Sequence, residues 1–323
     1  MIINVAYACD DVYIEQTTVS LLSLYKNCSH PQNIKVYFID MGISDESKKD
    51  LINLTQNYGS ELIIIPFDSI AYDLNISDIN GRHIKSVYAK LFFGRIPNIN
   101  RIIYLDSDTV IVGDIQELWN INLSENICAG VESIHTVEEN LRIGYYPNEK
   151  AINDGVVLMD LEKWRSENVL EKCMNYIEEM NGTPPILSEG TLNVVCRGKI
   201  KIIHPRFNLM SFIVGAKSYK IRILTKRKYY SQKTLDYATH YPCIIHYLSG
   251  FYNRPWCKEC SHPLKKEYLK YRNMTKWANI PLKDKKLPFR LKAIGFAYKI
   301  LPIELFVILR NISSLFKRKN GNA

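Results

Sequence analysis

Short apolar runs alternate with segments of helical period along the first two-thirds of the chain. Runs rich in β-branched residues predict six strands: Ile2 to Ala8, Ile34 to Asp40, Leu62 to Pro66, Arg101 to Leu105, Ile127 to Val131 and Val156 to Asp160. Between them, Ile14 to Lys26 and Ser44 to Asn57 are predicted to be helices, the second with Ser44 as its N-cap. Strands that alternate with helices indicate an α/β, Rossmann-like domain with a mostly parallel central sheet.

The pattern changes in the last third of the chain. From Ile200 to Gly250 it predicts short strands that form a lobe closing over one edge of the sheet, and a helix is expected near Pro263 to Trp277. After Pro281 the composition shifts to basic and apolar residues. We therefore expect one domain over residues 1–262 and a C-terminal, basic helical appendage over residues 263–323.

Charge is concentrated in the same C-terminal segment. The chain carries a net charge of +9, and residues 283–323 contain ten Lys/Arg against two Asp/Glu, a net +8. The rest of the chain is close to neutral, whereas a nucleic-acid-binding domain usually carries a basic stripe with interleaved aromatic residues. We therefore expect no nucleic-acid partner.

Two interpretations of the basic tail stay open. The apolar stretch Ile300 to Leu309 contains Pro302 and Glu304 and is too short to cross a bilayer, which takes ~20 apolar residues. Residues 283–323 either lie on an anionic membrane surface, which we favour, or pack as helices on the body with solvated lysines. The chain starts with a predicted strand and has no signal-like segment, so we expect a cytoplasmic protein, attached to the inner face of the membrane if the tail binds lipid.

The eight cysteines are scattered, mostly in apolar runs, and we expect reduced thiols without disulfides. Cys257 and Cys260 form a Cys-x-x-Cys pair with His262 nearby. Because this group lacks a complete second ligand pair, reduced thiols are favoured over zinc.

The strongest candidate chemistry is the Asp-x-Asp motif that ends the strand Arg101 to Leu105. Asp106 and Asp108 follow an apolar strand whose carboxyl end lies at the edge where open α/β sheets bind ligands. Alternate positions of an extended chain point the same way, so both carboxylates face one divalent cation. Alone, such a pair is more often an ordinary turn or cap.

Two further segments supply the remaining parts of a nucleotide-diphosphate site. Asp10 and Tyr13 follow the first strand, where an acid accepts from a base N–H and an aromatic ring stacks on it; the alternative is a helix cap. His246 ends a late apolar strand and is followed by Gly250 and Arg254. A lone His is more often structural, but with two carboxylates it gives a ligand set suited to manganese.

Together these segments resemble glycosyltransferase family 8, the retaining nucleotide-sugar transferases that include glycogenin and bacterial lipopolysaccharide galactosyl- and glucosyltransferases. The resemblance covers roughly residues 2 to 262. It rests on these segments, in the family's order: Ala8-Cys9-Asp10-Asp11-Val12-Tyr13, Arg82-His83-Ile84, Tyr88-Ala89-Lys90-Leu91, Leu105-Asp106-Ser107-Asp108, Asn153-Asp154-Gly155-Val156, Pro205-Arg206-Phe207-Asn208, and His246 with Gly250 and Arg254-Pro255-Trp256.

The resemblance implies a GT-A type domain that transfers a hexose from a UDP-hexose donor to a glycan or glycolipid acceptor. It implies Mn²⁺, with Mg²⁺ as a second candidate, held by Asp106, Asp108 and His246. The nucleotide-sugar-binding residues that it implies are Ala8, Asp10, Tyr13, Lys90, Asp106, Ser107, Gly250 and Arg254. Asn153 and Asp154 are placed near the donor sugar as catalytic candidates.

The chain departs from the family pattern near the sugar. Asp154 stands where Ala or Ser is usual, and Ser188-Glu189 stands where an Asp-Gln pair is common. Glu189 is the candidate nucleophile or polar stabiliser of an oxocarbenium-like state, with a plain helix N-terminal acid as the alternative. Glu132, at the end of a predicted strand, is a candidate contact to a donor hydroxyl.

Three other functions compete with a hexosyltransferase. A glycogenin-like self-glucosylating protein agrees with the 21 tyrosines, and a membrane-seeking tail speaks against it. The departures at Asp154 and Ser188 permit a nucleotide-sugar-binding protein without turnover. A nicotinamide-dependent dehydrogenase is rejected because no Gly-x-Gly-x-x-Gly follows the first strand.

Overall fold

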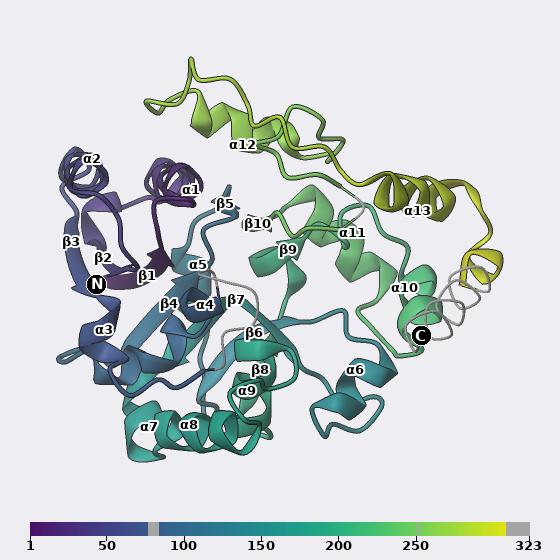
Figure 1. Ribbon diagram of the computed structural model, residues 1–323, viewed down its shortest axis with the longest axis horizontal. Coiled ribbons are helices and arrows are strands. Elements are labelled where there is room, and N and C mark those ends of the chain that lie inside the picture. The colour runs from purple at the N-terminus through teal and green to yellow at the C-terminus, as the bar shows by residue number, and fades with distance from the viewer. Residues whose placement is uncertain (77–83, 251, 308–323) are drawn as a thin grey trace.

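The computed structural model describes residues 1–76, 84–250 and 252–307, and its centre is a seven-stranded sheet of order β3-β2-β1-β4-β7-β6-β8 (Figure 1). The strands are β1 Ile3–Cys9, β2 Ile34–Asp40, β3 Glu61–Pro66, β4 Arg101–Leu105, β6 Cys128–Glu132, β7 Ile152–Asp160 and β8 Ile200–Ile203. β7 pairs antiparallel with β4 and β6, and the other neighbours pair in parallel. The predicted α/β fold with a mostly parallel sheet is confirmed.

Helices cover both faces of this sheet. Those before residue 200 are α1 Ile14–Asn27, α2 Asp45–Gln56, α3 Phe67–Ile70, α4 Ile84–Val87, α5 Gln116–Trp119, α6 Val137–Arg142, α7 Leu161–Ser166, α8 Val169–Glu179 and α9 Leu187–Val195, with 3₁₀ turns η1 Pro31–Asn33 and η2 Ala89–Arg95. Those after it are α10 Ser218–Thr225, α11 Gln232–His240, α12 Lys265–Arg272 and α13 Phe289–Ile300, with the 3₁₀ turn η3 Pro205–Asn208.

Strand alternation divides the core into two layers. Val5 and Tyr7 of β1 pack in one apolar cluster with Leu21 of α1. Ala6, on the opposite face of β1, packs in the other cluster with Phe92 of η2. Successive side chains of a strand point to opposite faces, so a run that is apolar throughout is buried on both sides, as the sequence of β1 indicates.

A second sheet of three short strands lies beside the carboxyl ends of β1 and β4. It consists of β5 Thr109–Ile111, β10 Ile244–His246 and β9 Leu209–Met210, in the order β5-β10-β9. The lobe expected from residue 200 to 250 is therefore divided, because β8 extends the central sheet while β9 and β10 join β5. The pairing of β10 with β5 brings the end of the domain against the Asp-x-Asp segment.

The strand predictions were accurate except at the start of β7. This strand begins at Ile152, whereas the apolar run predicted Val156. The reason is a side chain that acts as a ladder partner: Asn193 accepts from the backbone N–H of Ile152 at 2.8 Å and donates to its carbonyl oxygen at 2.8 Å. Asn153, Asp154 and Gly155 are thereby held in an extended strand. The predicted N-cap of α2 is confirmed, since Ser44 accepts from the backbone N–H of Ser47.

The C-terminal segment runs over the body from α12 to α13 (Figure 1). α12 is shorter than the predicted helix and packs on α1, where Arg272 Nε lies 2.7 Å from Glu15 Oε1. α13 lies near α10, with Lys220 Nζ 5.3 Å from the ring centroid of Tyr298. Over the described ranges, no helix has the length and apolar content needed to cross a membrane. All eight cysteines are free.

Candidate active site

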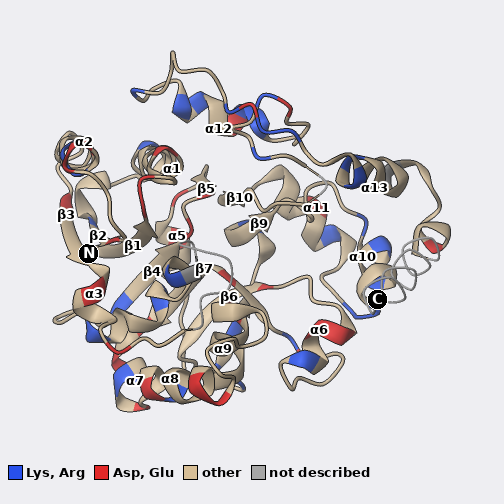
Figure 2. Cartoon of the chain, viewed as in Figure 1, with Lys and Arg blue, Asp and Glu red and all other residues tan. Residues whose placement is uncertain are grey.

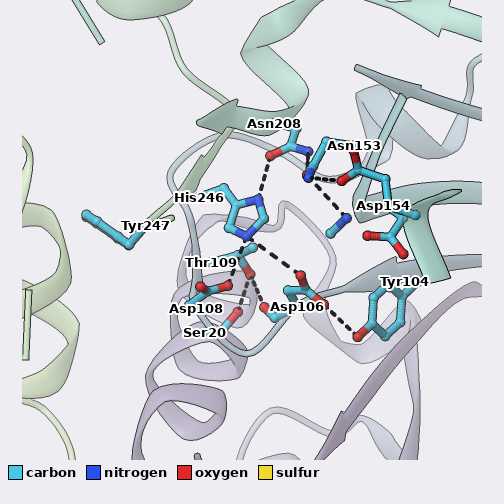
Figure 3. A network of polar contacts seen from close by, with 12 residues as sticks. Ser20, Tyr104, Asp106, Asp108, Thr109, Asn153, Asp154, Asn208, His246 and Tyr247 are labelled. Carbon is cyan, nitrogen blue, oxygen red and sulfur yellow. Dashed lines mark hydrogen bonds and ion pairs between the residues drawn. The ribbon is translucent and has the colours of Figure 1, made fainter. Parts of the chain in front are cut away.

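Asp106, Asp108 and His246 converge at the junction of the two sheets. The antiparallel register of β10 and β5 pairs His246 with Thr109, directly after Asp108. His246 Nε2 lies 3.0 Å from Asp108 Oδ1 and 3.7 Å from Asp106 Oδ2 (Figure 3). One ligand atom from each side chain lies within 4.8 Å of the others. We refer to these three residues as the cation cluster.

The imidazole of His246 is oriented for a cation. Asn208 donates through Nδ2 to Asn153 Oδ1 at 2.8 Å, so its own Oδ1 accepts from His246 Nδ1 at 2.9 Å. In a neutral ring, this hydrogen bond leaves Nε2 without a proton. Nε2 is buried, has no hydrogen-bond partner and faces two carboxylates. A lone pair opposite two carboxylates is favourable only with a positive charge between them, so these residues fit a divalent metal.

Charge at the cation cluster is balanced by Arg254, which contacts the Asp108 carboxylate and the carbonyl oxygen of Tyr247. Burial by itself would raise the pKa of Asp108, but His246 and Arg254 hold it well below its usual range. Burial would lower the pKa of His246, and the negative charges of Asp108 and Asp106 raise it instead. Both shifts have the same physical meaning: the two carboxylates attract positive charge to this position.

Gly155 has no side chain, and the space that a side chain would take there is occupied by the cation cluster. A Cβ atom at this position would lie 2.3 Å from His246 Cε1 and 2.6 Å from Asp106 Oδ2. The backbone is fixed there as well, because the Asp106 N–H donates to the Gly155 carbonyl oxygen at 2.8 Å. Glycine is therefore required at the start of β7 for close approach to the cluster.

Lys90 lies beside the cation cluster in a buried salt bridge with Asp154. Its side chain is almost fully buried, with Nζ 2.8 Å from Asp154 Oδ2 and 4.0 Å from Asp106 Oδ1. Ser188 Oγ donates to Asp154 Oδ2 at 2.6 Å. Burial would lower the pKa of Lys90, but Asp154 and Asp106 raise it, so the ammonium stays charged. The departures at Asp154 and Ser188 thus form one polar unit around this lysine.

Glu189 is held by three donors at the start of α9. Ser133 Oγ donates to Oε1 at 2.9 Å, His135 Nε2 lies 2.5 Å from the same oxygen, and Asn153 Nδ2 donates to Oε2 at 2.8 Å. Burial would lower the pKa of His135, but its pairing with Glu189 raises it. Glu189 is therefore more than a plain helix N-terminal acid.

A continuous chain of side-chain hydrogen bonds connects Glu189 with the cation cluster. It runs from His246 through Asn208 and Asn153 to Glu189 (Figure 3 shows its first part). The sequence indicated Asn208 only as the last residue of the family-like segment that starts at Pro205, without a role, and it gave no indication of Ser133 or His135. The two amides fix the separation and orientation of the carboxylate relative to the imidazole.

The turn that leads into α9 has a strained backbone. Ile186 and Leu187 both adopt positive φ, 60° and 53°. Bulky side chains rarely adopt this left-handed conformation, which costs on the order of 1–3 kcal/mol per residue and is concentrated at functional sites. The turn directly precedes Ser188 and Glu189 and sets their direction.

The end of β1 reaches the same site. Asp10 accepts from the Val12 N–H at 3.0 Å, while Asp11 accepts from the Ser44 N–H at 3.0 Å and so caps α2. Burial raises the pKa of Tyr13, while the charge of Arg254 lowers it and that of Asp108 raises it. Ala8 is buried in β1.

Ser107 is held against α1, because Thr17 Oγ1 donates to Ser107 Oγ at 2.8 Å. This contact fixes the middle of the Asp-x-Asp segment. Gly250 lies against Phe212, since a Cβ atom there would lie 2.5 Å from the phenyl ring. Arg82 and His83, which the family resemblance singled out, lie outside the described residues.

Glu132 is fully buried and faces protein cations. Its carboxylate lies 3.3 Å from Arg227 Nη2 and 3.4 Å from Lys150 Nζ. Burial raises its pKa, against the effect of these two cations. A contact between Glu132 and a donor hydroxyl stays a prediction.

The Cys-x-x-Cys pair does not form a metal site with His262. Within the part of the chain that the structure describes, Asp106, Asp108 and His246 are the one group of His, Cys, Asp or Glu side chains with ligand spacing.

Comparisons with known proteins agree on one family. Residues 4–260 match the family model described as glycosyl transferase family 8. The chain is 26% identical over 287 residues to General stress protein A of Bacillus subtilis, covering 86% of this chain and 96% of that protein. It is 23% identical over 281 residues to lipopolysaccharide 1,2-glucosyltransferase of Escherichia coli, covering 82% of this chain and 76% of that protein.

The fold is also found among solved structures. Galactosyltransferase LgtC, in complex with donor and acceptor sugar analogues, superimposes with a TM-score of 0.67 at 20% identity. The match covers 90% of this chain and 99% of LgtC. At this identity the likeness shows a shared GT-A fold.

Proposed function

The chain belongs to glycosyl transferase family 8, and we propose that it is a retaining hexosyltransferase that moves glucose or galactose from a UDP-sugar to a cell-surface glycan or glycolipid. One observation carries this proposal: two carboxylates from one part of the sequence meet the buried imidazole nitrogen of a distant histidine, and this nitrogen has no hydrogen-bond partner. Such a site favours a bound cation. The negatively charged diphosphate of a nucleotide sugar is a ligand that this cation would attract.

Asp106, Asp108 and His246 are proposed to hold Mn²⁺, or Mg²⁺, under the diphosphate of the donor. When bound, the metal supplies positive charge that stabilises the departing UDP. Arg254 lies against Asp108 and is proposed to turn toward the same phosphates. Asp10, Tyr13, Ala8 and Ser107 are proposed to bind the nucleotide, with Gly250 beside it.

Lys90 is proposed to fix the donor from the protein side. Its ammonium lies between Asp106 and Asp154, so it links the metal ligand to the residues near the sugar. Asp154 and Asn153 are adjacent on β7, and Asn153 also joins Glu189 to Asn208. We propose that these two β7 residues position the sugar ring for transfer.

Retention of configuration requires the acceptor hydroxyl to arrive on the face that UDP leaves. A covalent intermediate or a front-side attack assisted by the leaving phosphate both satisfy this requirement. Both carboxylate oxygens of Glu189 accept hydrogen bonds, which supports a held anion that stabilises positive charge on the ring over a mobile nucleophile. Glu132 stays a candidate contact to a donor hydroxyl.

The acceptor and location are proposed from the relatives and the tail. A relative named as a lipopolysaccharide glucosyltransferase supports an acceptor of the cell surface. The tail from residue 283 is basic and, through α13, apolar, which supports attachment to the inner face of the cell membrane. No nucleic-acid partner is proposed.

The experiment that tests the function is a donor screen with the full chain. UDP-glucose, UDP-galactose and other UDP-sugars are incubated with Mn²⁺, with Mg²⁺ or with EDTA, and released UDP is measured. We expect slow hydrolysis of one UDP-hexose that depends on Mn²⁺ and stops in EDTA. Tight binding of a UDP-sugar without any UDP release would instead identify a non-catalytic binding protein. A stepwise gain of hexose mass on the protein itself would identify a self-glucosylating one.

A further inference from the structure

A large apolar groove lies between the segment after β9 and the C-terminal helix α13. Its volume is about 1110 Å³, above the ~300–1,000 Å³ of ordinary small-ligand pockets. One wall comes from residues 211–225 and the other from residues 289–306. The side chains that line it include Val214, Ile221, Leu224, Ile294, Ala297 and Phe306.

We propose that this groove holds the hydrocarbon chain of a lipid-linked acceptor whose head group is an anionic phosphate. The inference deepens the proposed transferase function and rests on it, because it assigns the acceptor to amphiphilic lipids. Three observations carry it: the contact of its lining with the backbone of His246, the cations that line it and the exposed apolar face of α13.

The lining of the groove reaches the strand that carries His246. Ser211 lines it, and its backbone N–H donates to the carbonyl oxygen of His246 at 3.1 Å. Gly250, from the segment after His246, lines the same end and abuts Phe212. An acceptor whose chain occupies the groove would therefore present its head group toward the donor site.

Cations surround the apolar lining. Lys217, Lys220 and Arg290 line the groove from both walls, and Figure 2 shows Lys and Arg on α10 and α13 where the two helices approach. Among residues with described placement, none of these three forms a salt bridge with an acid. Glu139, which also lines the groove, is engaged in the capping box of α6 with Thr136. The rim is thus complementary to a phosphate, and the interior to a hydrocarbon chain.

The outer face of α13 gives such a chain a route from the bilayer. Phe296 is 65% exposed and Ile300 60%, and neither lines the groove, whereas the 86% exposed Phe289 lies at the edge where this face meets the groove lining. Contiguous exposed apolar side chains beside basic residues are typical of helices that lie in a membrane interface. With this face in the lipid, the groove, whose lining includes Phe289 and Ala293 of the same helix, would open next to the acyl region. A peptide would not require this outer apolar face, and so the observations favour a lipid.

The probes are octyl, decyl and dodecyl phosphate, each below its micelle concentration, titrated calorimetrically into the full chain. We expect saturable binding with affinity that rises up to about fourfold for each added methylene, because each one leaves water for the groove. Inorganic phosphate should bind at least about 100-fold more weakly than dodecyl phosphate. Equal binding of inorganic phosphate, or no saturable binding of the alkyl phosphates, would overturn the proposal.

Two neighbouring positions on α13 give a matched pair of variants. Ala297 lines the groove, whereas Phe296 faces solvent. Ala297→Trp should fill the groove and weaken dodecyl phosphate binding at least tenfold, while Phe296→Trp should leave it within twofold. If Ala297→Trp lowers the melting temperature, Val214→Trp on the opposite wall replaces it with the same expectation. Unchanged binding in a folded groove variant contradicts the proposal.

A second copy of the chain is the competing occupant. Sedimentation of the full chain decides this: a dimer that Ala297→Trp converts to a monomer would overturn the lipid assignment. The donor assay keeps this test separate from the proposed function. Wild-type protein that binds dodecyl phosphate without hydrolysing any UDP-hexose contradicts the transferase function alone. Hydrolysis without alkyl phosphate binding contradicts the groove alone.

Discussion

The cation cluster and helix α13 differ in which kind of side chain they bury and which they expose to water. In and beside the cluster, ionisable side chains are buried, with His246 0% and Lys90 1% exposed, and each of these two faces a carboxylate. In α13, apolar side chains are exposed, with Phe289 at 86%. Burying charge costs free energy unless it is paired, and exposing apolar surface costs free energy unless something covers it. Both regions are therefore incomplete alone, the first without a cation and an anionic ligand, the second without an apolar partner.

The largest expected effect comes from removing one acid of the cation cluster. Asp106→Ala or Asp108→Ala should lower the rate of UDP-hexose turnover by at least about 10²–10³-fold, since a preorganised group that stabilises the leaving charge is lost. UDP binding in Mn²⁺ should weaken as well, which calorimetry with and without EDTA measures. Asp68→Ala, an exposed acid on α3, is the control. Full activity in either cluster variant would remove the basis of the comparison.

Adding one methyl group at Gly155 should have the next largest effect on the site. Gly155→Ala places a Cβ atom 2.3 Å from His246 Cε1, so the imidazole or the Asp106 carboxylate must move. We expect Mn²⁺ affinity to fall by about 10–100-fold, the range seen when groups that orient metal ligands are altered. Gly130→Ala on β6 is the matched control, because the three atoms nearest its new Cβ all belong to Ile152. Equal Mn²⁺ affinity in the two variants would show that Gly155 matters only for packing.

Removing the tail should affect membrane recovery and leave chemistry in solution intact. Deletion of residues 289–323 removes seven Lys/Arg and one Glu. It keeps residues 283–288, where the Lys283 N–H donates to the Trp256 carbonyl oxygen at 2.9 Å. We expect at least about tenfold less protein on anionic vesicles, because each basic residue near the surface contributes ~1 kcal/mol, and turnover with a water-soluble acceptor within twofold of the full chain. Vesicles of neutral lipid are the control, and unchanged partition after the deletion would place the tail on the body.

The site residues that lie at the ends of strands could be predicted from the sequence. Asp106 and Asp108 were predicted to meet His246 because all three follow apolar strands that end at one rim, and the structure brings them within 4.8 Å. The sequence did not indicate the short strand β5 or the bounds of β9 within the predicted short strands of residues 200–250, because both are too brief to show a period.

The polar connections of the site were beyond reach for a different reason. The bonds from Asn208 to Asn153 and from Asn153 to Glu189 join residues 55 and 36 positions apart. Which side chains meet across such separations depends on strand register and on the strained turn before α9, neither of which leaves a periodic trace in the sequence. Composition revealed a basic, apolar tail, but the groove appears only when α13 is placed beside residues 211–225.

The reversed direction of β7 has a consequence for how this enzyme family can diversify. In an all-parallel sheet, only segments that leave strands reach the binding edge. Here β7 runs opposite to its neighbours, so the connection that enters it, residues 133–151, arrives at the same rim. That connection contributes His135 to the Glu189 contacts and Glu139 to the groove, while Gly155 stays fixed by pairing inside the sheet. Under the proposed function, acceptor preference can therefore change through insertions and deletions in this segment while Asp106, Asp108 and His246 keep their positions.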